Sequence, residues 1–260
     1  MSNSNGLKGK RILVVGASSG IGAAIAKAGV ASGAAVTVSA RRENMLNELV
    51  AAAGGGHVVA GDASNADDAK RIVEGAVEAM GGLDLVVYVA GYGVLQPLAK
   101  SDVDVWTAIY KVNVIGANLI AGEAVPHMNR SGIVAFVSSR TVEDANALFS
   151  SYSASKAALD QCIRTWRVEH PERRFVRVVM GNCAPTEFAN HMNAELIGDA
   201  LETWVKQGIP GGIMQVDDVA DALLESLAVA LSHPDIDLPE LKMDARLDQD
   251  IALTDLDPGN

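Results

Sequence analysis

Residues 11–22, RILVVGASSGIG, decide the fold of this chain. Residues 11–15 form a short apolar run that predicts a buried strand, and the alanine-rich residues 21–31 predict a helix that stops near Gly33. The small residues between them would let a pyrophosphate approach the backbone, and the helix N-terminus supplies N–H donors and a positive dipole. The spacing is G-x-x-x-G-x-G rather than the dinucleotide fingerprint G-x-G-x-x-G, so a plain tight turn stays an alternative. The residues predicted to hold a phosphate are Gly16, Ser18, Ser19, Gly20, Ile21 and Gly22.

The rest of the chain repeats this alternation of strand and helix. Apolar runs that predict strands occupy residues 35–39, 57–60, 83–90, 133–138 and 175–180, with a weaker one in 235–243. Predicted helices occupy residues 43–53, 66–80, 102–128 and a segment that begins near Tyr152. Apolar strands separated by helices indicate a single-domain α/β fold, a doubly wound parallel sheet of the Rossmann type in three α/β/α layers. We expect this domain to span residues 1–243 and an acidic C-terminal tail to follow at 244–260.

The composition limits the partners. The 260 residues carry a formal net charge of −11, which disfavours binding to a nucleic-acid backbone. No apolar run reaches the roughly 18 residues of a membrane span, and the polar N-terminus lacks the core of a signal peptide, so we expect a cytoplasmic protein. Cys162 and Cys183 show no metal-ligand spacing, and we therefore predict no metal site and two buried thiols.

The residues after the second predicted strand indicate which dinucleotide binds. An NAD site places an acidic residue roughly 20 residues beyond the phosphate loop, whereas an NADP site uses arginine. Here Arg41 and Arg42 follow the strand, and Glu43 comes only after both. Positive charge at a helix N-terminus is unfavourable, so the pair requires a local anion, such as a 2′-phosphate held by charge-assisted bonds. We predict NADP(H) as the cofactor; a solvated helix start is the alternative.

Tyr152 and Lys156, in YSASK, are the candidate proton-transfer pair. They are four residues apart and share one face of a helix. A phenol has a pKa near ~10, too high for ready proton exchange at neutral pH. A cation on the same face favours the phenolate, and we therefore expect Lys156 to lower the pKa of Tyr152.

Several motifs together resemble the short-chain dehydrogenase/reductase family, from about Lys8 to about Phe188. The motifs are the 16–22 loop, Asn113, Ser139, Tyr152 and Lys156, in this order along the chain. The resemblance implies that Ser139 holds the substrate oxygen, with Ser138 as its competitor, and that Lys156 also binds the nicotinamide ribose. It further implies that Asn113, a poor residue for a helix interior, holds a water in a proton relay to Lys156.

Other positions follow from the same resemblance. Asp62 and Ala63 correspond to the pair that meets the adenine ring, Ala90 and Gly91 end a strand near the cofactor, and Thr186 is expected to bond the nicotinamide carboxamide. The sequence also departs from the family: Asn-Asn-Ala-Gly reads Tyr-Val-Ala-Gly at residues 88–91, and Pro-Gly reads Met-Gly at 180–181. The amides that normally support Asn113 are therefore replaced by another arrangement.

Two segments border the expected substrate. Residues 190–208 mix Met192, Leu196, Ile197 and Trp204 with acids, which indicates either internal packing or an apolar lid over the site. Residues 140–151 form a more polar loop. We predict an oxidoreductase that interconverts a secondary alcohol and a ketone, acts on an apolar small molecule and forms a homo-oligomer, a dimer or a tetramer. The alternatives are an NAD-linked dehydrogenase of a cyclic diol and a non-catalytic NADP-binding sensor.

Overall fold

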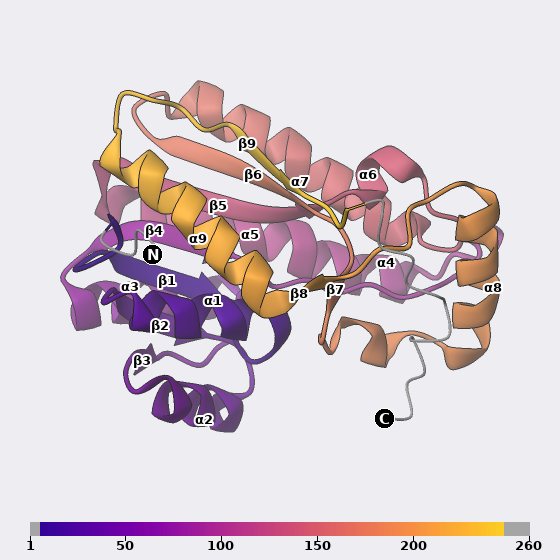
Figure 1. Ribbon diagram of the computed structural model, residues 1–260, viewed down its shortest axis with the longest axis horizontal. Helices are drawn as coiled ribbons and strands as arrows, with labels where there is room; N and C mark the ends of the chain where they lie inside the picture. The colour runs from indigo at the N-terminus through magenta and orange to yellow at the C-terminus, as the bar shows by residue number, and fades with distance from the viewer. Residues whose placement is uncertain (1–5, 247–260) are drawn as a thin grey trace.

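A seven-stranded parallel sheet forms the centre of the molecule (Figure 1). The structure, a computed structural model, describes residues 6–246. The strands run in the order β3-β2-β1-β4-β5-β6-β9. Their bounds are β1 Arg11–Val15, β2 Ala35–Ser39, β3 His57–Val58, β4 Leu83–Tyr88, β5 Met128–Ser139, β6 Arg174–Met180 and β9 Glu240–Met243. The order reverses between β1 and β4, which is where ligands bind in doubly wound sheets.

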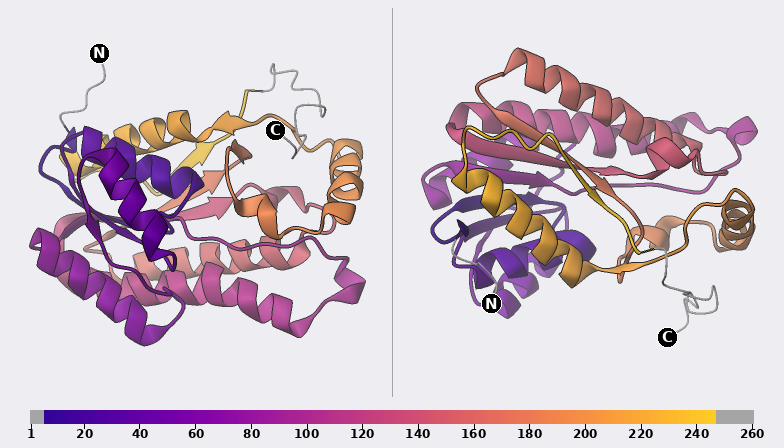
Figure 2. Two further views of the ribbon diagram at one scale, coloured as in Figure 1. Left: turned by 90° about the horizontal axis from the view of Figure 1, so that it is seen from below. Right: turned by 45° about the horizontal axis from the view of Figure 1, so that its top comes forward.

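Helices cover both faces of the sheet, as Figure 2 shows from two further directions. On one face lie α1 (Gly20–Ala31), α2 (Glu43–Ala53) and α9 (Val216–Ser232); on the other lie α3 (Ala66–Met80), α5 (Ala117–Ala124) and α7 (Ser150–Glu169). Alternate residues of β1 feed the two cores: Ile12 and Val14 pack with α1 and α9, Leu13 and Val15 with α3 and α5. The predicted three-layer, doubly wound fold is confirmed.

Some predicted strand ends are wrong by a few residues. β3 ends at Val58 rather than at residue 60, although Val59 still donates to Val38 O and Gly61 to Ala40 O. β4 ends at Tyr88, because the N–H groups of Val89 and Ala90 both bond to the same acceptor, Val15 O, and the ladder stops there. β5 begins earlier than expected, at Met128, with a register shift against β4.

The long helix predicted over residues 102–128 is confirmed as one continuous helical stretch from Val103 to His127, but it is not a regular α-helix throughout. The segment consists of α4 (Val103–Tyr110), a π-helical segment (Lys111–Gly116), α5 and a 3₁₀ turn (Val125–His127). Asn113 lies inside the π-helical segment, where its side chain bonds to neighbouring residues rather than to solvent. Such π-helical insertions are frequent at functional sites.

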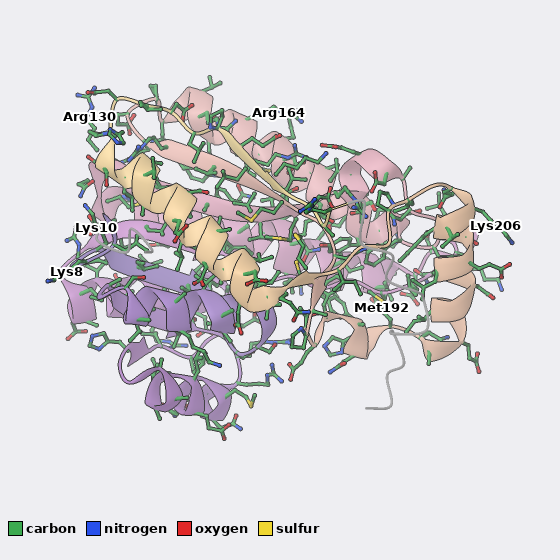
Figure 3. The ribbon with its side chains drawn as sticks, in the orientation of Figure 1. Lys8, Lys10, Arg130, Arg164, Met192 and Lys206 are labelled. Atoms are coloured by element: carbon green, nitrogen blue, oxygen red, sulfur yellow. The ribbon has the colours of Figure 1, made fainter. Side chains whose placement is uncertain are left out.

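The chain between β6 and α9 extends beyond the carboxyl ends of the strands. It contains β7 (Cys183–Ala184) and β8 (Met214–Gln215), which pair with each other, a 3₁₀ turn (Phe188–His191) and α8 (Ala194–Lys206). Figure 3 shows Met192 and Lys206 at the opposite end of the molecule from Lys8 and Lys10. The shorter helices α6 (Thr141–Asp144) and a 3₁₀ turn (Leu98–Lys100) lie on other connections.

The seventh strand predicted within 235–243 is confirmed as β9, which pairs with β6. Asp244, the first residue of the predicted tail, forms an ion pair with Arg140. Residues 247–260 of that tail lie outside the described part of the chain. Cys162 and Cys183 are free but only half-buried, so the prediction of two buried thiols is wrong. Within residues 6–246, no helix combines the length and apolarity needed to cross a membrane.

Candidate active site

One cavity of about 900 Å³ lies at the carboxyl ends of the strands. It is lined by the loops after β1, β2, β4, β5 and β6 and by the start of α7. All but one of the predicted site residues line this cavity: Gly16, Ser18, Ser19, Gly20, Ile21, Gly22, Arg41, Arg42, Asp62, Ala63, Ala90, Gly91, Ser139, Tyr152, Lys156 and Thr186. Asn113 does not line it.

The loop after β1 needs glycine for its own packing. Gly16 has a φ of +97°, and a Cβ there would lie 2.4 Å from Ala90 N. A Cβ at Gly22 would lie 2.3 Å from Gly16 O. Ser19, the N-cap of α1, makes no side-chain capping hydrogen bond, so the N-terminus of α1 faces the cavity without a side-chain cap. The loop is thus both a tight turn and an open helix N-terminus, and the two interpretations of the sequence do not exclude each other.

Arg42 is already engaged by an acidic side chain. Its Nη2 donates to Ser18 Oγ at 2.8 Å and to Glu187 Oε2 at 2.5 Å. The ion pair lowers the pKa of the Glu187 carboxyl. Arg41 is exposed, and no hydrogen bond or ion pair to it is found within residues 6–246. One arginine is therefore open, while the other would have to share its guanidinium between Glu187 and a ligand.

Tyr152 lies near the floor of the cavity, 9% exposed. Burial raises the pKa of its phenol to about 12, and a hydrogen bond with Ser139 opposes that shift. The sequence-based expectation of a lowered pKa is therefore wrong for this arrangement. The reason is the position of Lys156: its Nζ donates to Val137 O at 2.7 Å and lies 5.7 Å from the centre of the Tyr152 ring. Tyr152 carries its proton at neutral pH and is a proton donor in this state.

Burial also shifts Lys156. The side chain is 2% exposed, and burial lowers the pKa of its ammonium to about 8, with nearby Asp160 acting in the opposite sense. Asp160 also accepts a hydrogen bond from Ser138 Oγ at 2.5 Å. Because Ser138 is committed to Asp160, Ser139 is the serine whose hydroxyl is beside Tyr152.

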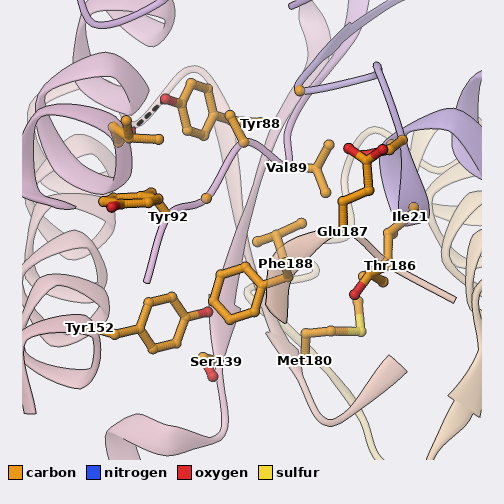
Figure 4. Close-up of a pocket in the computed structure, with 18 of the residues that line it drawn as sticks. Ile21, Tyr88, Val89, Tyr92, Ser139, Tyr152, Met180, Thr186, Glu187 and Phe188 are labelled. Atoms are coloured by element: carbon orange, nitrogen blue, oxygen red, sulfur yellow. Dashed lines mark hydrogen bonds between the residues drawn. The ribbon is translucent and has the colours of Figure 1, made fainter. Parts of the chain in front are cut away.

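The Ser139 hydroxyl is oriented from its other side by Thr141. The Thr141 N–H donates to Ser139 Oγ at 3.2 Å, and the Thr141 hydroxyl donates to the same oxygen at 3.0 Å. Ser139 thus lies between Thr141, at the start of α6, and the phenol of Tyr152. Figure 4 shows Ser139 close to Tyr152. This arrangement suits a hydroxyl that orients a substrate oxygen next to a proton donor.

Asn113 is buried beside the cavity and connects Tyr92 to Ser155 by hydrogen bonds. Its Oδ1 accepts from Tyr92 N at 2.8 Å, and its Nδ2 donates to Tyr92 O and to Ser155 Oγ. A Cβ at Gly91 would lie 3.8 Å both from Asn113 Oδ1 and from Lys156 Nζ. Gly91 therefore keeps the space between the amide and the ammonium open, where a larger residue would fill it.

Tyr88 replaces the missing family amide at this position. Its hydroxyl donates to Val112 O at 2.6 Å, drawn as the dashed line in Figure 4, and ties β4 to the π-helical segment. A Cβ at Gly116 would lie 2.5 Å from this hydroxyl, so glycine is needed there. The Tyr88 phenol thus holds the residue next to Asn113, and the altered support for Asn113 relative to the family stays a prediction.

Aromatic rings surround Tyr152 on the substrate side. The Tyr152 ring lies 4.5 Å from that of Phe149 and 5.2 Å from that of Phe188, measured between ring centres. Thr186 lies on the loop after β7, and its Cγ2 would be 3.2 Å from a Cβ at Gly20, so it faces the phosphate loop. Figure 4 shows Phe188 between Tyr152 and Thr186.

The packing interpretation of residues 190–208 agrees with the structure. Met192, Leu196, Ile197 and Trp204 pack against the cluster of Leu95, Phe149, Tyr152 and Ala200. None of these four side chains lines the cavity. Sequence reasoning missed Phe149, Phe188, Glu187 and Asn146, which do line it. Asn146 and Phe149 lie in the loop 140–151, which the sequence indicated only as a border of the pocket. No spacing rule marks Glu187 or Phe188.

The fold and the cavity define an α/β protein whose ligand site lies at the carboxyl ends of a doubly wound sheet. The chain belongs to the short-chain dehydrogenase/reductase family, since it matches the short chain dehydrogenase family over residues 10–199.

Individual relatives support this membership. The chain is 33% identical over 228 residues to the glucose 1-dehydrogenase of Gluconobacter oxydans (strain 621H), a match that covers 83% of this chain and 84% of that protein. It is 32% identical over 221 residues to an uncharacterized oxidoreductase of Methylorubrum extorquens, covering 82% and 88%. Its fold matches a short chain dehydrogenase from Burkholderia cenocepacia J2315 in complex with NADP, with a TM-score of 0.80, 26% identity and coverage of 94% and 99%.

Proposed function

We propose that the protein is an NADP(H)-dependent oxidoreductase that interconverts a secondary alcohol and a ketone, with Tyr152 as the proton donor and acceptor. The observation that carries this proposal is that the 16–22 loop lines the same cavity as Ser139, Tyr152 and Lys156. The loop residues would hold the phosphates of a dinucleotide, and the residues at the other end of the cavity would exchange a proton with the substrate.

The residues present fit a phosphorylated dinucleotide. The tight loop and the uncapped N-terminus of α1 would hold the pyrophosphate. Arg41, which is open, and Arg42 with Ser18 would hold the 2′-phosphate. Asp62 and Ala63 would meet the adenine, with Ala90 and Gly91 beside the cofactor, Lys156 at the nicotinamide ribose and Thr186 at the carboxamide. When bound, the cofactor supplies the hydride.

The chain's own residues move the proton. Tyr152, whose pKa is raised to about 12, donates a proton to the carbonyl oxygen in the reductive direction, and Ser139 orients that oxygen. Tyr152 would regain its proton from solvent by way of Lys156 and a water, and Asn113 would hold that water beside the space at Gly91. In the oxidative direction the same phenol must first lose its proton.

A specific observation keeps NAD and a diol substrate as the second candidate. Glu187 neutralises Arg42, which weakens the case for a 2′-phosphate at that side chain. In addition, one relative carries the name glucose 1-dehydrogenase, an enzyme of a polyhydroxylated substrate. A non-catalytic sensor would have no need for the Tyr152 phenol. The homo-oligomer and the cytoplasmic location remain predictions from the sequence.

The test is NADPH consumption by the purified protein across a panel of aliphatic, cyclic and aromatic ketones, with the reverse reaction followed on the matching alcohols. The proposal expects turnover of at least one ketone that is lost in Tyr152→Phe. No turnover with NADPH or NADH on any member, while the cofactor still binds, would favour the sensor instead.

A further inference from the structure

We propose that Asn146 is a substrate-recognition residue and that the preferred substrate is a hydroxylated ketone or the corresponding diol. The Asn146 carboxamide would pair with a hydroxyl group of the substrate while the carbonyl lies at Tyr152. This inference rests on the proposed function, and it replaces the purely apolar substrate expected from the sequence with one that carries a second polar group.

The first observation is an unpaired polar atom. Asn146 is 7% exposed, it lines the cavity, and its Oδ1 has no hydrogen-bond partner. Buried polar side-chain atoms are nearly always hydrogen-bonded, so such an atom at the wall of a cavity calls for an explanation. Because the oxygen itself is buried, a ligand group would supply the missing partner once the carboxamide turns toward the cavity.

The second observation is that the local backbone is strained but firmly held. Ala145 and Leu148, on either side, have φ values of 51° and 63°, in the left-handed region that residues with a Cβ rarely adopt. Strain of this kind persists only where the surroundings impose it, and it concentrates at functional sites. The two residues flank the Asn146–Ala147 dipeptide and turn the chain around it.

The surroundings impose this conformation through three hydrogen bonds to successive carbonyls. Phe149 N donates to Asn146 O at 3.2 Å, Trp204 Nε1 to Ala147 O at 2.8 Å, and Gln96 N to Leu148 O at 2.7 Å. Every carbonyl from Asn146 to Leu148 therefore has a partner, whereas the carboxamide oxygen between them has none. The loop is built to hold this side chain at the cavity wall.

The chemistry of the pocket selects a hydroxyl as the complementary group. A hydroxyl both donates and accepts, so it can pair with a carboxamide in either orientation of the amide. Asn146 lines the same cavity as Ser139 and Tyr152, so we assign the group that would pair with it to the molecule whose carbonyl those two residues would hold. Phe149 and Phe188 provide apolar contact for the carbon skeleton. A ketone without a hydroxyl would leave the Asn146 oxygen unpaired.

The experiment compares matched ketones in the wild type and in Asn146→Leu, which keeps the size and removes the polar group. The probes are acetophenone, 2-hydroxyacetophenone and 3-hydroxy-1-phenylpropan-1-one, each with NADPH. We expect the ratio of kcat/KM for the better hydroxylated ketone over acetophenone to fall about tenfold or more in the variant, since a lost hydrogen bond to a buried group has that effect. Acetophenone, which has no hydroxyl group to pair with Asn146, is the reference ketone for this ratio.

The intrinsic reactivity of each ketone is the same with both proteins, so it cancels when the ratio in the variant is compared with the ratio in the wild type. The same replacement at Asn47, exposed on α2, serves as the matched control and should leave the ratio unchanged. An unchanged ratio in Asn146→Leu, or an equal loss with all three ketones, would overturn the assignment.

A binding measurement separates this inference from the proposed function. The shift in Tm caused by 2-hydroxyacetophenone in the presence of NADP⁺ needs no turnover. We expect a shift in the wild type that shrinks in Asn146→Leu, while the Tm of the unliganded variant does not fall, because an unpaired buried oxygen has been removed. Equal Tm shifts in the wild type and in Asn146→Leu overturn the role of Asn146, even if no ketone is reduced. If the Tm shift depends on Asn146 but no NADPH is consumed, only the proposed function is contradicted.

Discussion

The two halves of the cavity differ in the residues that line them and in how exposed the charged and reactive groups are. The nucleotide half, formed by the loops after β1 and β2 with Asp62 and Ala63, consists of close-packed glycine backbone and exposed arginines. The catalytic half is formed by the end of β5, residues 140–149, the start of α7 and residues 186–191, and its central groups, Ser139, Tyr152 and Lys156, are buried. In the first half charge is open to a ligand; in the second, burial controls protonation, as with Tyr152 and Lys156.

This difference indicates how binding and chemistry are divided. Exposed charges contribute to affinity and discrimination but are screened by salt, whereas a buried phenol and ammonium respond strongly to small changes around them. Replacements in the catalytic half should therefore change turnover most, and replacements in the nucleotide half should change the choice and affinity of the cofactor.

The largest effect is expected for Tyr152→Phe. The replacement removes the proton that general acid catalysis needs, which is typically worth ~10²–10⁴-fold in rate. We expect kcat for ketone reduction to fall by about that factor while NADPH affinity, measured by fluorescence titration, is retained. Tyr110→Phe, in which the hydroxyl is lost from a ring stacked on Trp106, is the matched control and should keep full activity. Near wild-type reduction by Tyr152→Phe would remove its catalytic role.

In the nucleotide half, Arg41→Ala/Arg42→Ala should weaken NADPH binding roughly ten- to a hundred-fold. The reason is that a hydrogen bond to a charged group is worth about 1.5–3 kcal/mol, and 1.4 kcal/mol corresponds to a factor of ten. NADH, which lacks the 2′-phosphate, should bind as before, and the effect should shrink at high salt. Arg164→Ala, an exposed arginine on α7, is the control. A similar loss for both dinucleotides would mean that the pair does not read the 2′-phosphate.

How well the sequence predicted each half follows from the same difference. The nucleotide half was predictable because its residues are contiguous: an apolar strand, a run of small residues and a helix leave a signature within 11–22. The strands of the sheet were predictable for the same reason, apart from their ends, where β4 stops because Val89 and Ala90 share one acceptor on β1.

The catalytic half was predictable only where the family motifs name residues. The π-helical segment depends on the Tyr88 hydroxyl, a contact from a separate strand that no local pattern encodes. The exposed fraction of Tyr152, and with it the direction of its pKa shift, depends on rings from Phe149 and Phe188. Likewise, Glu187 reaches Arg42 across a large separation in the chain. Long-range contacts of this kind leave no periodicity to recognise.

The protonation of Tyr152 should appear in the pH dependence of the two directions. Its pKa is raised, so the phenolate that alcohol oxidation requires is rare at pH 7 and increases about tenfold per pH unit below that pKa. We expect kcat/KM for alcohol oxidation to rise with pH between about 7 and 10, and kcat/KM for ketone reduction not to rise. Rate profiles over this range check the sign; an oxidation rate that is flat from neutral to alkaline pH would contradict a protonated phenol.

The smallest effect is expected where the two halves meet, at the Glu187–Arg42 ion pair. Both side chains are more than a third exposed, 41% and 46%, so the pair is worth roughly 0.2–1 kcal/mol. Glu187→Gln should free Arg42 and remove a negative charge, and NADPH affinity should then rise up to about fivefold, with little change for NADH. Glu202→Gln, which breaks an exposed pair with Lys206 on α8, is the control. Weaker NADPH binding in Glu187→Gln would show that the pair supports the cofactor site instead of competing with it.

The most direct test of the whole account is kcat/KM of the wild type for NADPH and for NADH with one ketone at saturating concentration. Arg41, which is open, and Arg42, which is shared with Glu187, line the same cavity as the protonated phenol of Tyr152, and the proposed function assigns the two arginines to a 2′-phosphate. This assignment predicts turnover that depends on Tyr152 and prefers NADPH by about tenfold or more. Equal use of both cofactors, or a preference for NADH, would contradict it and would favour the NAD-linked diol dehydrogenase.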